Sequence, residues 1–78
     1  MNKKFKIIGV NPKDKNHVLG AIVETPNGVM VGQRAFLKGT TSTGRAIEMT
    51  TSLVTKVNGQ GDCLIIQTKN TMYVLKEL

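Results

Sequence analysis

The chain has 78 residues, of which 40% are hydrophobic and only three are aromatic, and its 11 basic and 5 acidic residues give a formal net charge of +6. A domain of this size buries only somewhat more than roughly 60% of its unfolded surface, which argues against a large enclosed active site. The apolar share is ordinary for a globular chain and argues against disorder throughout. We therefore expect one small domain over residues 1–78, with a core of Val, Ile, Leu and Met.

The cysteine content and the hydropathy pattern indicate in which cellular compartment the protein is expected. Cys63 is the only cysteine, whereas small secreted domains usually carry several disulfide pairs. No apolar stretch of signal-peptide length follows the basic residues at 3–4. The apolar runs are also far shorter than the roughly 20 residues that cross a bilayer. We therefore expect a soluble, cytoplasmic protein without a membrane partner.

The first expected strand covers residues 4–10. Polar and apolar residues alternate from Lys4 to Ile7, which is typical of a strand with one solvated face. Phe5 is expected to face the core. Residues 11–16 contain Pro12 together with Asn and Asp, a composition that favours a turn or loop.

The second expected strand covers residues 18–25 and ends in the turn sequence Thr25-Pro26-Asn27-Gly28. Pro favours the first corner of a type I turn, and Gly tolerates a positive φ, so this sequence predicts a hairpin with a three-residue loop. The register that follows pairs three sets of positions on the core face: Val23 with Val31, Leu19 with Ala35, and Thr25 with Val29.

The opposite face of this predicted hairpin is also apolar, because it holds Val18, Ile22, Met30 and Phe36. A fully solvated face would need less apolar surface. We therefore expect Ile22, Met30 and Phe36 to form an interaction face for another sheet or another subunit.

The middle of the chain contains a clear loop and a long β-rich run. The nearest approach to helical periodicity is at residues 34–39, where one turn at most is expected. Residues 39–45 are small, polar and aperiodic, which indicates a loop. Residues 46–57 are β-rich, but the alternation slips at residues 50–52, which predicts a bulge or bend. Residues 58–62 are expected to form the next turn.

Two apolar runs at residues 63–75 meet at Lys69-Asn70 and predict a terminal hairpin. With a two-residue turn, Ile66 opposes Tyr73 and Leu64 opposes Leu75 on one face. Together with the earlier runs this gives about six short antiparallel strands at spacings near ten residues. The predicted fold is all-β, a small single-domain barrel of the SH3-like or OB-like kind, with a two-sheet sandwich as the alternative.

The loop at 39–45 resembles a phosphate-binding motif only in part. Gly39 and Gly44 have the spacing of the G-x-x-x-x-G-K-[ST] pattern, but Arg45 and Ala46 stand where Lys and a hydroxyl residue are needed. These departures argue against nucleotide hydrolysis by this loop. The flanking Lys38 and Arg45 could contact phosphates of a nucleic acid backbone, and the alternative is a solvated connection between two strands.

Basic residues also concentrate near the start of the chain. Alternation places Lys4 and Lys6 on one exposed face, with Lys13 and Lys15 in the adjoining loop, where they could form a positive patch. The alternative is an edge strand protected from aggregation by lysines. The candidate nucleic-acid-binding residues are therefore Lys4, Lys6, Lys13, Lys15, Lys38 and Arg45.

The sequence offers no catalytic, metal-binding or cofactor-binding constellation. His17 has no partner nearby in sequence, Cys63 heads an apolar strand, and the five acidic residues are scattered singly. With so few aromatic residues, base stacking is not expected, and binding to nucleic acid would rest on salt-sensitive phosphate contacts.

Two functions remain as hypotheses, and neither is enzymatic. The first is a small basic module that contacts the backbone of DNA or RNA. The alternative is a protein–protein interaction module, such as an accessory subunit, an inhibitor or a self-assembling component. It would use its apolar sheet face or an open strand edge.

Overall fold

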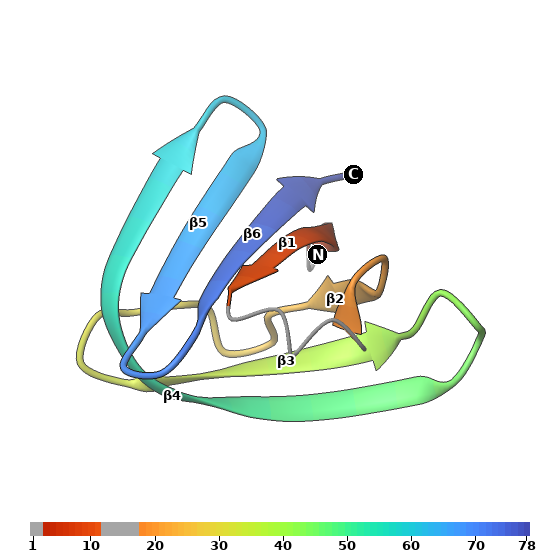
Figure 1. Cartoon of the computed structure of the whole chain (residues 1–78), viewed down its shortest axis with the longest axis horizontal. Coiled ribbons are helices and arrows are strands. Elements are labelled where there is room, and N and C mark those ends of the chain that lie inside the picture. The colour runs from red at the N-terminus through yellow and green to blue at the C-terminus, as the bar shows by residue number, and fades with distance from the viewer. Residues whose placement is uncertain (1–2, 12–17) are drawn as a thin grey trace.

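The computed structural model describes residues 3–11 and 18–78. Its strands are β1 (Lys4–Asn11), β2 (Ile22–Glu24), β3 (Arg34–Thr40), β4 (Ala46–Gln60), β5 (Cys63–Thr68) and β6 (Met72–Glu77). Each strand pairs antiparallel with its neighbours in sequence, and β1 pairs with β6, so the six strands close into a barrel (Figure 1). The prediction of a small all-β barrel is confirmed.

The strand order separates the two kinds of barrel that the sequence left open. Every pairing except the closing one joins strands consecutive in sequence, which makes the barrel a meander. An OB-fold is a Greek-key barrel. The observed strand order is therefore incompatible with an OB-fold and compatible with an SH3-like barrel. No helix in residues 3–11 and 18–78 is long and apolar enough to cross a membrane.

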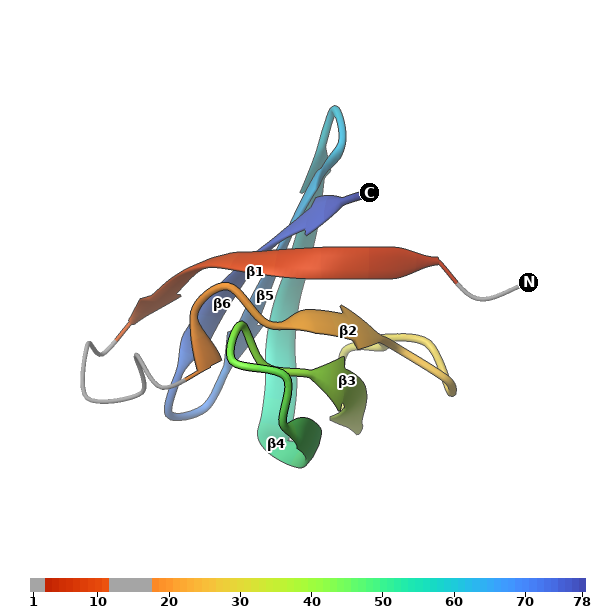
Figure 2. The same cartoon turned by 90° about the vertical axis from the view of Figure 1, so that its right-hand side faces the viewer.

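The long strand β4 takes part in two sheets that cross. Its first part pairs with β3 from Ala46 to Leu53, and its second part pairs with β5 from Val54 to Gln60. Figure 1 shows the change of direction between these parts, and Figure 2 shows β4 and β5 running steeply across the direction of β1. The core lies between the two sheets.

Alternation along the strands supplies the core side chains. Ile7, Leu37, Ile66 and Leu75 are completely buried, and each has exposed or half-buried neighbours along its strand. Phe5 and Tyr73 are also buried. The remaining buried apolar residues are Val18, Ala21, Val23, Ala35 and Val54. The core is therefore largely aliphatic.

A β-bulge bends β4 at the place where the alternation slips in sequence. Phe36 pairs with Thr50 but Arg34 pairs with Leu53, so β4 has one extra residue opposite Ala35. The Ala35 amide donates to Thr51 Oγ1 at 3.0 Å, and the same hydroxyl donates to the Ser52 carbonyl at 2.7 Å. A buried side chain thus replaces the backbone partner that Ala35 loses. The expected bulge or bend at 50–52 is confirmed.

The predicted hairpin after residue 25 is wrong. The turn itself forms, because the Gly28 amide donates to the Thr25 carbonyl at 2.9 Å and Gly28 has a φ of 73°. However, residues 25–33 form a loop, and Val23 pairs with Gly39 rather than with Val31. Residues 34–39, for which the sequence allows one helical turn at most, belong to β3. The turn chemistry was correct, but the turn does not join paired strands.

The predicted core of this segment changes accordingly. Residues 18–21 form a tight turn closed by the Ala21 amide and the Val18 carbonyl at 3.1 Å, instead of extending β2. Val18 is therefore buried, whereas Leu19 and Val31, which were expected in the core, are 36% and 60% exposed.

The terminal hairpin has the predicted register. Leu64 pairs with Leu75 and Ile66 with Tyr73, and the turn is Lys69-Asn70. Thr68 supports this turn through its hydroxyl, which accepts from the Thr71 amide at 3.0 Å. The preceding turn is shorter than predicted, because β4 continues to Gln60 and only Gly61 and Asp62 lie outside the strands.

Gly39 lies where β2 approaches β3 closely, opposite Val23 in the antiparallel pairing. A Cβ atom at this position would overlap the Ile22 carbonyl oxygen and lie 2.8 Å from Val23 Cα. We expect Gly39→Ala to lower the free energy of unfolding by about 1–3 kcal/mol or more, because backbone atoms must move. Urea denaturation measures this change.

Gly59→Ala is the matched control. Gly59 also lies within a strand, but an added Cβ would meet no atom within 4 Å. The prediction fails if the two variants are equally stable.

The Thr51 hydroxyl is expected to stabilise the bend. Thr51→Val keeps the side-chain shape but leaves the buried Ala35 amide without an acceptor, which should cost about 1–3 kcal/mol in urea denaturation. Thr50→Val is the control, since Thr50 is exposed and the change should stay within about 0.5 kcal/mol. Equal effects of the two substitutions would contradict this role.

Candidate binding surfaces

The outer face of the β1–β2–β3–β4 sheet carries a row of alternating charges. The registers place Lys4 opposite Glu24, Glu24 opposite Lys38, and Lys38 opposite Glu48. Lys38 Nζ lies 3.9 Å from Glu48 Oε1. Opposite charges at directly opposed positions attract one another. The strands therefore bring Lys4 and Lys38 to one face, as a basic site would need, but they also place two carboxylates beside them.

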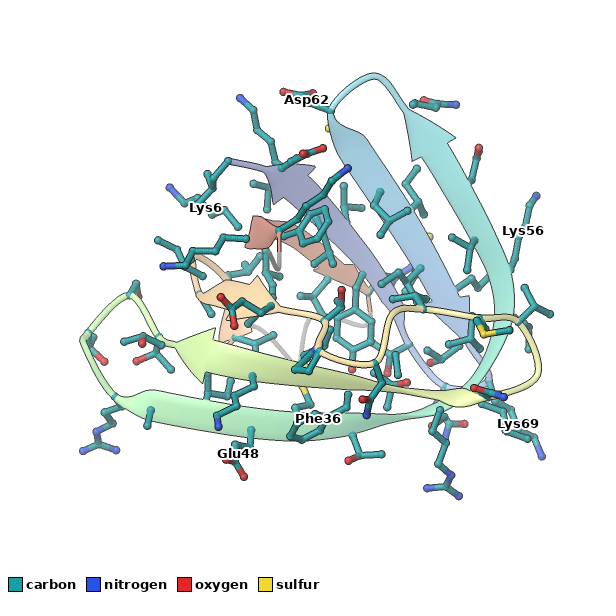
Figure 3. The ribbon with its side chains drawn as sticks, turned by 180° about the vertical axis from the view of Figure 1, so that it is seen from behind. Lys6, Phe36, Glu48, Lys56, Asp62 and Lys69 are labelled. Atoms are coloured by element: carbon teal, nitrogen blue, oxygen red, sulfur yellow. The ribbon has the colours of Figure 1, made fainter. Side chains whose placement is uncertain are left out.

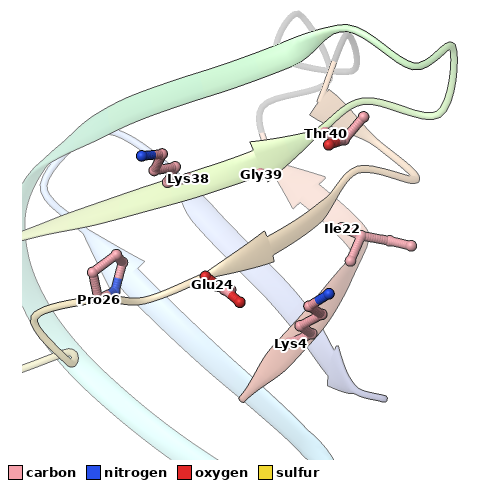
Figure 4. Close-up of a pocket in the computed structure, with 7 residues that line it drawn as sticks. All are labelled: Lys4, Ile22, Glu24, Pro26, Lys38, Gly39 and Thr40. Atoms are coloured by element: carbon pink, nitrogen blue, oxygen red, sulfur yellow. The ribbon is translucent and has the colours of Figure 1, made fainter. Parts of the chain in front are cut away.

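A groove lies over the short strand β2 on this face (Figure 4). Its lining residues are Lys4, Ile22, Glu24, Pro26, Lys38, Gly39 and Thr40. Glu24 is half-buried and projects between Lys4 and Lys38 in Figure 4. A carboxylate at this position would repel a phosphate, so the groove itself is a poor phosphate site.

Lys6 and Lys76 form a different arrangement on the neighbouring strands. They are directly opposite each other in the β1–β6 register, and both are exposed. The ion pairs of the described residues are Lys3–Glu77, at 3.6 Å, and Lys38–Glu48, so neither Lys6 nor Lys76 has a carboxylate partner among them. Sequence reasoning missed Lys76, although its position next to the core residue Leu75 indicates that it points outward.

Of the remaining predicted basic residues, the structure describes Arg45, which lies beyond the row of charges in the β3–β4 turn. Arg45 is exposed at the end of the β3–β4 turn. Two hydroxyls of this turn bond within it: Thr41 Oγ1 accepts from the Arg45 amide and is 3.1 Å from Thr43 Oγ1. They therefore support the turn itself. Lys13 and Lys15 lie outside the described residues.

The predicted apolar interaction face is divided. Ile22 is 42% exposed on the outer face of β2, and Phe36 is half-buried on the outer face of β3. In the register, the charged pair Glu24 and Lys38 lies between the position of Ile22 and that of Phe36. Met30 is 59% exposed in the β2–β3 loop. The sheet therefore does not join these residues into one apolar surface.

Within residues 3–11 and 18–78 there is no group of three or more His, Cys, Asp or Glu side chains that could hold a metal ion. Cys63 is half-buried, and its Sγ lies 3.7 Å from Asp62 Oδ1. His17 lies outside the described residues.

A second hollow lies between the bend of β4 and the β5–β6 turn. It is lined by Val18, Met49, Thr50, Thr51, Ser52, Asn70, Thr71 and Tyr73. The Tyr73 hydroxyl reaches Met49 Sδ at 4.0 Å. Burial raises the pKa of the Tyr73 phenol above its ordinary value, and a hydrogen bond with the Thr71 side chain opposes this shift.

Comparison with protein-family models, with curated proteins and with solved structures gives no match to this chain.

The raised pKa of Tyr73 predicts a loss of stability at high pH. The unfolded phenol ionises near its ordinary pKa of about 10, while the folded phenol stays protonated to a higher pH. The contribution of the neutral Tyr73 phenol to the free energy of unfolding is therefore fully present below about pH 10. It is lost as the pH rises through the folded-state pKa.

Two measurements check this prediction. Tyr73 is the only tyrosine and there is no tryptophan, so phenolate absorbance reports the folded-state pKa directly. Urea denaturation at rising pH should also show a smaller loss of stability in Tyr73→Phe than in the parent chain. A phenol that titrates at or below the ordinary value would contradict the prediction.

Proposed function

We propose that this protein is a non-enzymatic basic module of the cytoplasm that contacts the phosphate backbone of nucleic acid through Lys6 and Lys76. Lys4 lies two residues before Lys6 on the same exposed face of β1 and extends this basic surface. We refer to these three residues as the β1–β6 basic surface.

The observation that carries the proposal is the direct opposition of Lys6 and Lys76. Like charges at opposed positions destabilise a sheet, by up to about 1 kcal/mol. Here the repulsion falls on the strand pair that closes the barrel. A phosphate between the two ammonium groups would remove the repulsion, since residues that face each other across strands are about 5 Å apart at Cα.

The surrounding charges favour Lys6 and Lys76 over Lys4 and Lys38 as the main phosphate contacts. Lys38 is engaged by Glu48, and Lys4 faces Glu24. Lys6 instead faces the aliphatic Ile22 on its other side. The unpaired positive charge of this sheet is therefore greatest between β1 and β6.

The type of contact follows from the composition of the surface. It contains no aromatic side chain, and Phe5 and Tyr73 are buried in the core. Base stacking therefore contributes nothing, and binding should depend on phosphate charge and fall steeply with salt. Discrimination between base sequences is not expected.

Binding to a protein partner is the second candidate function. Ile22, Met30, Val31 and Leu53 are all more than 40% exposed, which favours a contact with another molecule. Binding of a partner protein through an open strand edge loses support, because a closed ring of strands has no terminal strand to which another could be added.

Fluorescence anisotropy of labelled single-stranded DNA, duplex DNA and RNA at about 50 and 200 mM salt tests the proposal. The dependence of the binding constant on salt counts the phosphates engaged. Lys6→Gln and Lys76→Gln should each weaken binding and reduce the salt slope by about one. Lys76→Gln should also stabilise the fold slightly, because it removes the like-charge pair.

Lys56→Gln is the matched control, since it removes the same charge from an exposed position on β4, away from this surface. It should affect binding less than Lys76→Gln. Equal losses in the two variants would mean that net charge alone drives the binding. Absence of binding at 50 mM salt would overturn the proposal.

A further inference from the structure

Three exposed aliphatic side chains gather where β4 bends. Met30 and Val31 are 59% and 60% exposed on the tight turn of the β2–β3 loop, and Leu53 is 47% exposed on β4. The Gly32 amide donates to the Val54 carbonyl at 2.8 Å, and the Val54 amide donates to the Gln33 carbonyl at 2.9 Å. These bonds hold the turn beside Leu53. We call Met30, Val31 and Leu53 the β4-bend patch.

Basic residues flank this patch on both sides. Arg34 is directly opposite Leu53 on β3, and the Lys69 amide donates to the Leu53 carbonyl at 3.0 Å from the β5–β6 turn. Arg34 and Lys69 are both exposed. An aliphatic centre between two cations is complementary to a ligand that is both apolar and anionic.

The carboxylates of the described residues lie elsewhere. Glu24 and Glu48 belong to the row of charges on the β1–β2–β3–β4 sheet. Asp62 and Glu77 meet at the far end of β5, where the Glu77 amide donates to the Asp62 carbonyl. Figure 3 shows Asp62 and Lys69 at opposite ends of β5 and Glu48 well apart from Lys69. No described acidic residue therefore neutralises Arg34 and Lys69.

The composition of the patch decides between possible occupants. A second copy of the chain would bring like charges together if the same patches met. Nucleic acid without an aromatic partner for its bases would contact only the two cations and leave the apolar centre uncovered, and membrane-surface binding typically uses an amphipathic helix, which this patch lacks. We propose that the β4-bend patch binds an acidic segment of a partner protein that presents a leucine or a similar aliphatic side chain.

Methyl NMR with a defined peptide tests this proposal. The probe is the synthetic peptide Glu-Glu-Leu-Leu-Glu-Glu, added to the full chain at low salt. The methyl signals of Met30, Val31 and Leu53 should shift progressively and return toward their free positions as salt is added. Control peptides with Ser in place of Leu, or with Gln in place of Glu, should produce much smaller shifts.

Variants separate the patch from the rest of the surface. Val31→Ser should abolish most of the peptide-induced shifts, whereas Leu19→Ser, which alters another exposed aliphatic residue in a turn, should leave them unchanged. Both side chains are exposed, so the fold should survive, and the unperturbed core methyl signals verify this. Shifts that persist in Val31→Ser would overturn the proposal.

Three further outcomes would also overturn it. Broadening of the patch signals by phosphatidylglycerol vesicles, without shifts from the peptide, would assign the patch to a lipid surface. Concentration-dependent shifts without peptide would assign it to a second copy of the chain. Shifts of the patch caused by an unlabelled DNA oligonucleotide, instead of the peptide, would assign it to nucleic acid. A failure of DNA binding at Lys6 and Lys76 would leave the peptide result intact.

Discussion

The fold depends on one strand that belongs to both sheets. β4 has 15 residues and must turn from β3 toward β5 without leaving buried backbone groups unpaired. Two bulges achieve this change of direction, one opposite Ala35 and one at Thr55 between the pairs of Val54 and Lys56. Bulges increase the local twist and bend of a strand. The Thr51 hydroxyl satisfies the Ala35 amide that the first bulge leaves unpaired, and the bent strand pairs with both β3 and β5 in the closed ring.

The same geometry determines the surfaces that are available for binding. Closure of the ring places β6 beside β1 and so brings Lys76 next to Lys6. The shortness of β2 leaves the groove beside Glu24, and the bend of β4 exposes Leu53 next to the β2–β3 loop. The two proposed surfaces differ in chemistry, since the first is centred on two opposed lysines and the second on exposed apolar side chains. The barrel can therefore offer one face to a polyanion and another to a protein.

Features determined by residues close in sequence could be predicted, and features determined by distant residues could not. The terminal hairpin joins Ile66 to Tyr73 across a two-residue turn, so alternation and turn chemistry specify it fully. The bulge in β4 was visible as a slip in alternation. The turn ending at Gly28 was also recognised, but its place in the sheet was wrong, because the pairing of β2 depends on the close approach that Gly39 permits.

The candidate site shows the same limit. Outward positions of Lys4 and Lys6 follow from alternation within β1 alone. Lys76 was missed because its neighbour is a strand near the other end of the sequence. The acidic partners of Lys4 and Lys38 were missed for a similar reason, since they become apparent only when the registers of four strands are known.

The pairing of β1 with β6 also affects the rate at which the chain folds. All other pairings join consecutive strands, whereas this one joins Ile7 to Leu75 and requires closure of almost the whole chain. Long-range contacts of this kind form late and slow folding, because loop entropy is lost before any contact is gained. While the ring is still open, β1 and β6 are free edges, and the lysines on them would discourage a second chain from adding a strand. The lysines whose mutual repulsion weakens the closed β1–β6 pairing thus protect the chain from aggregation before that pairing has formed.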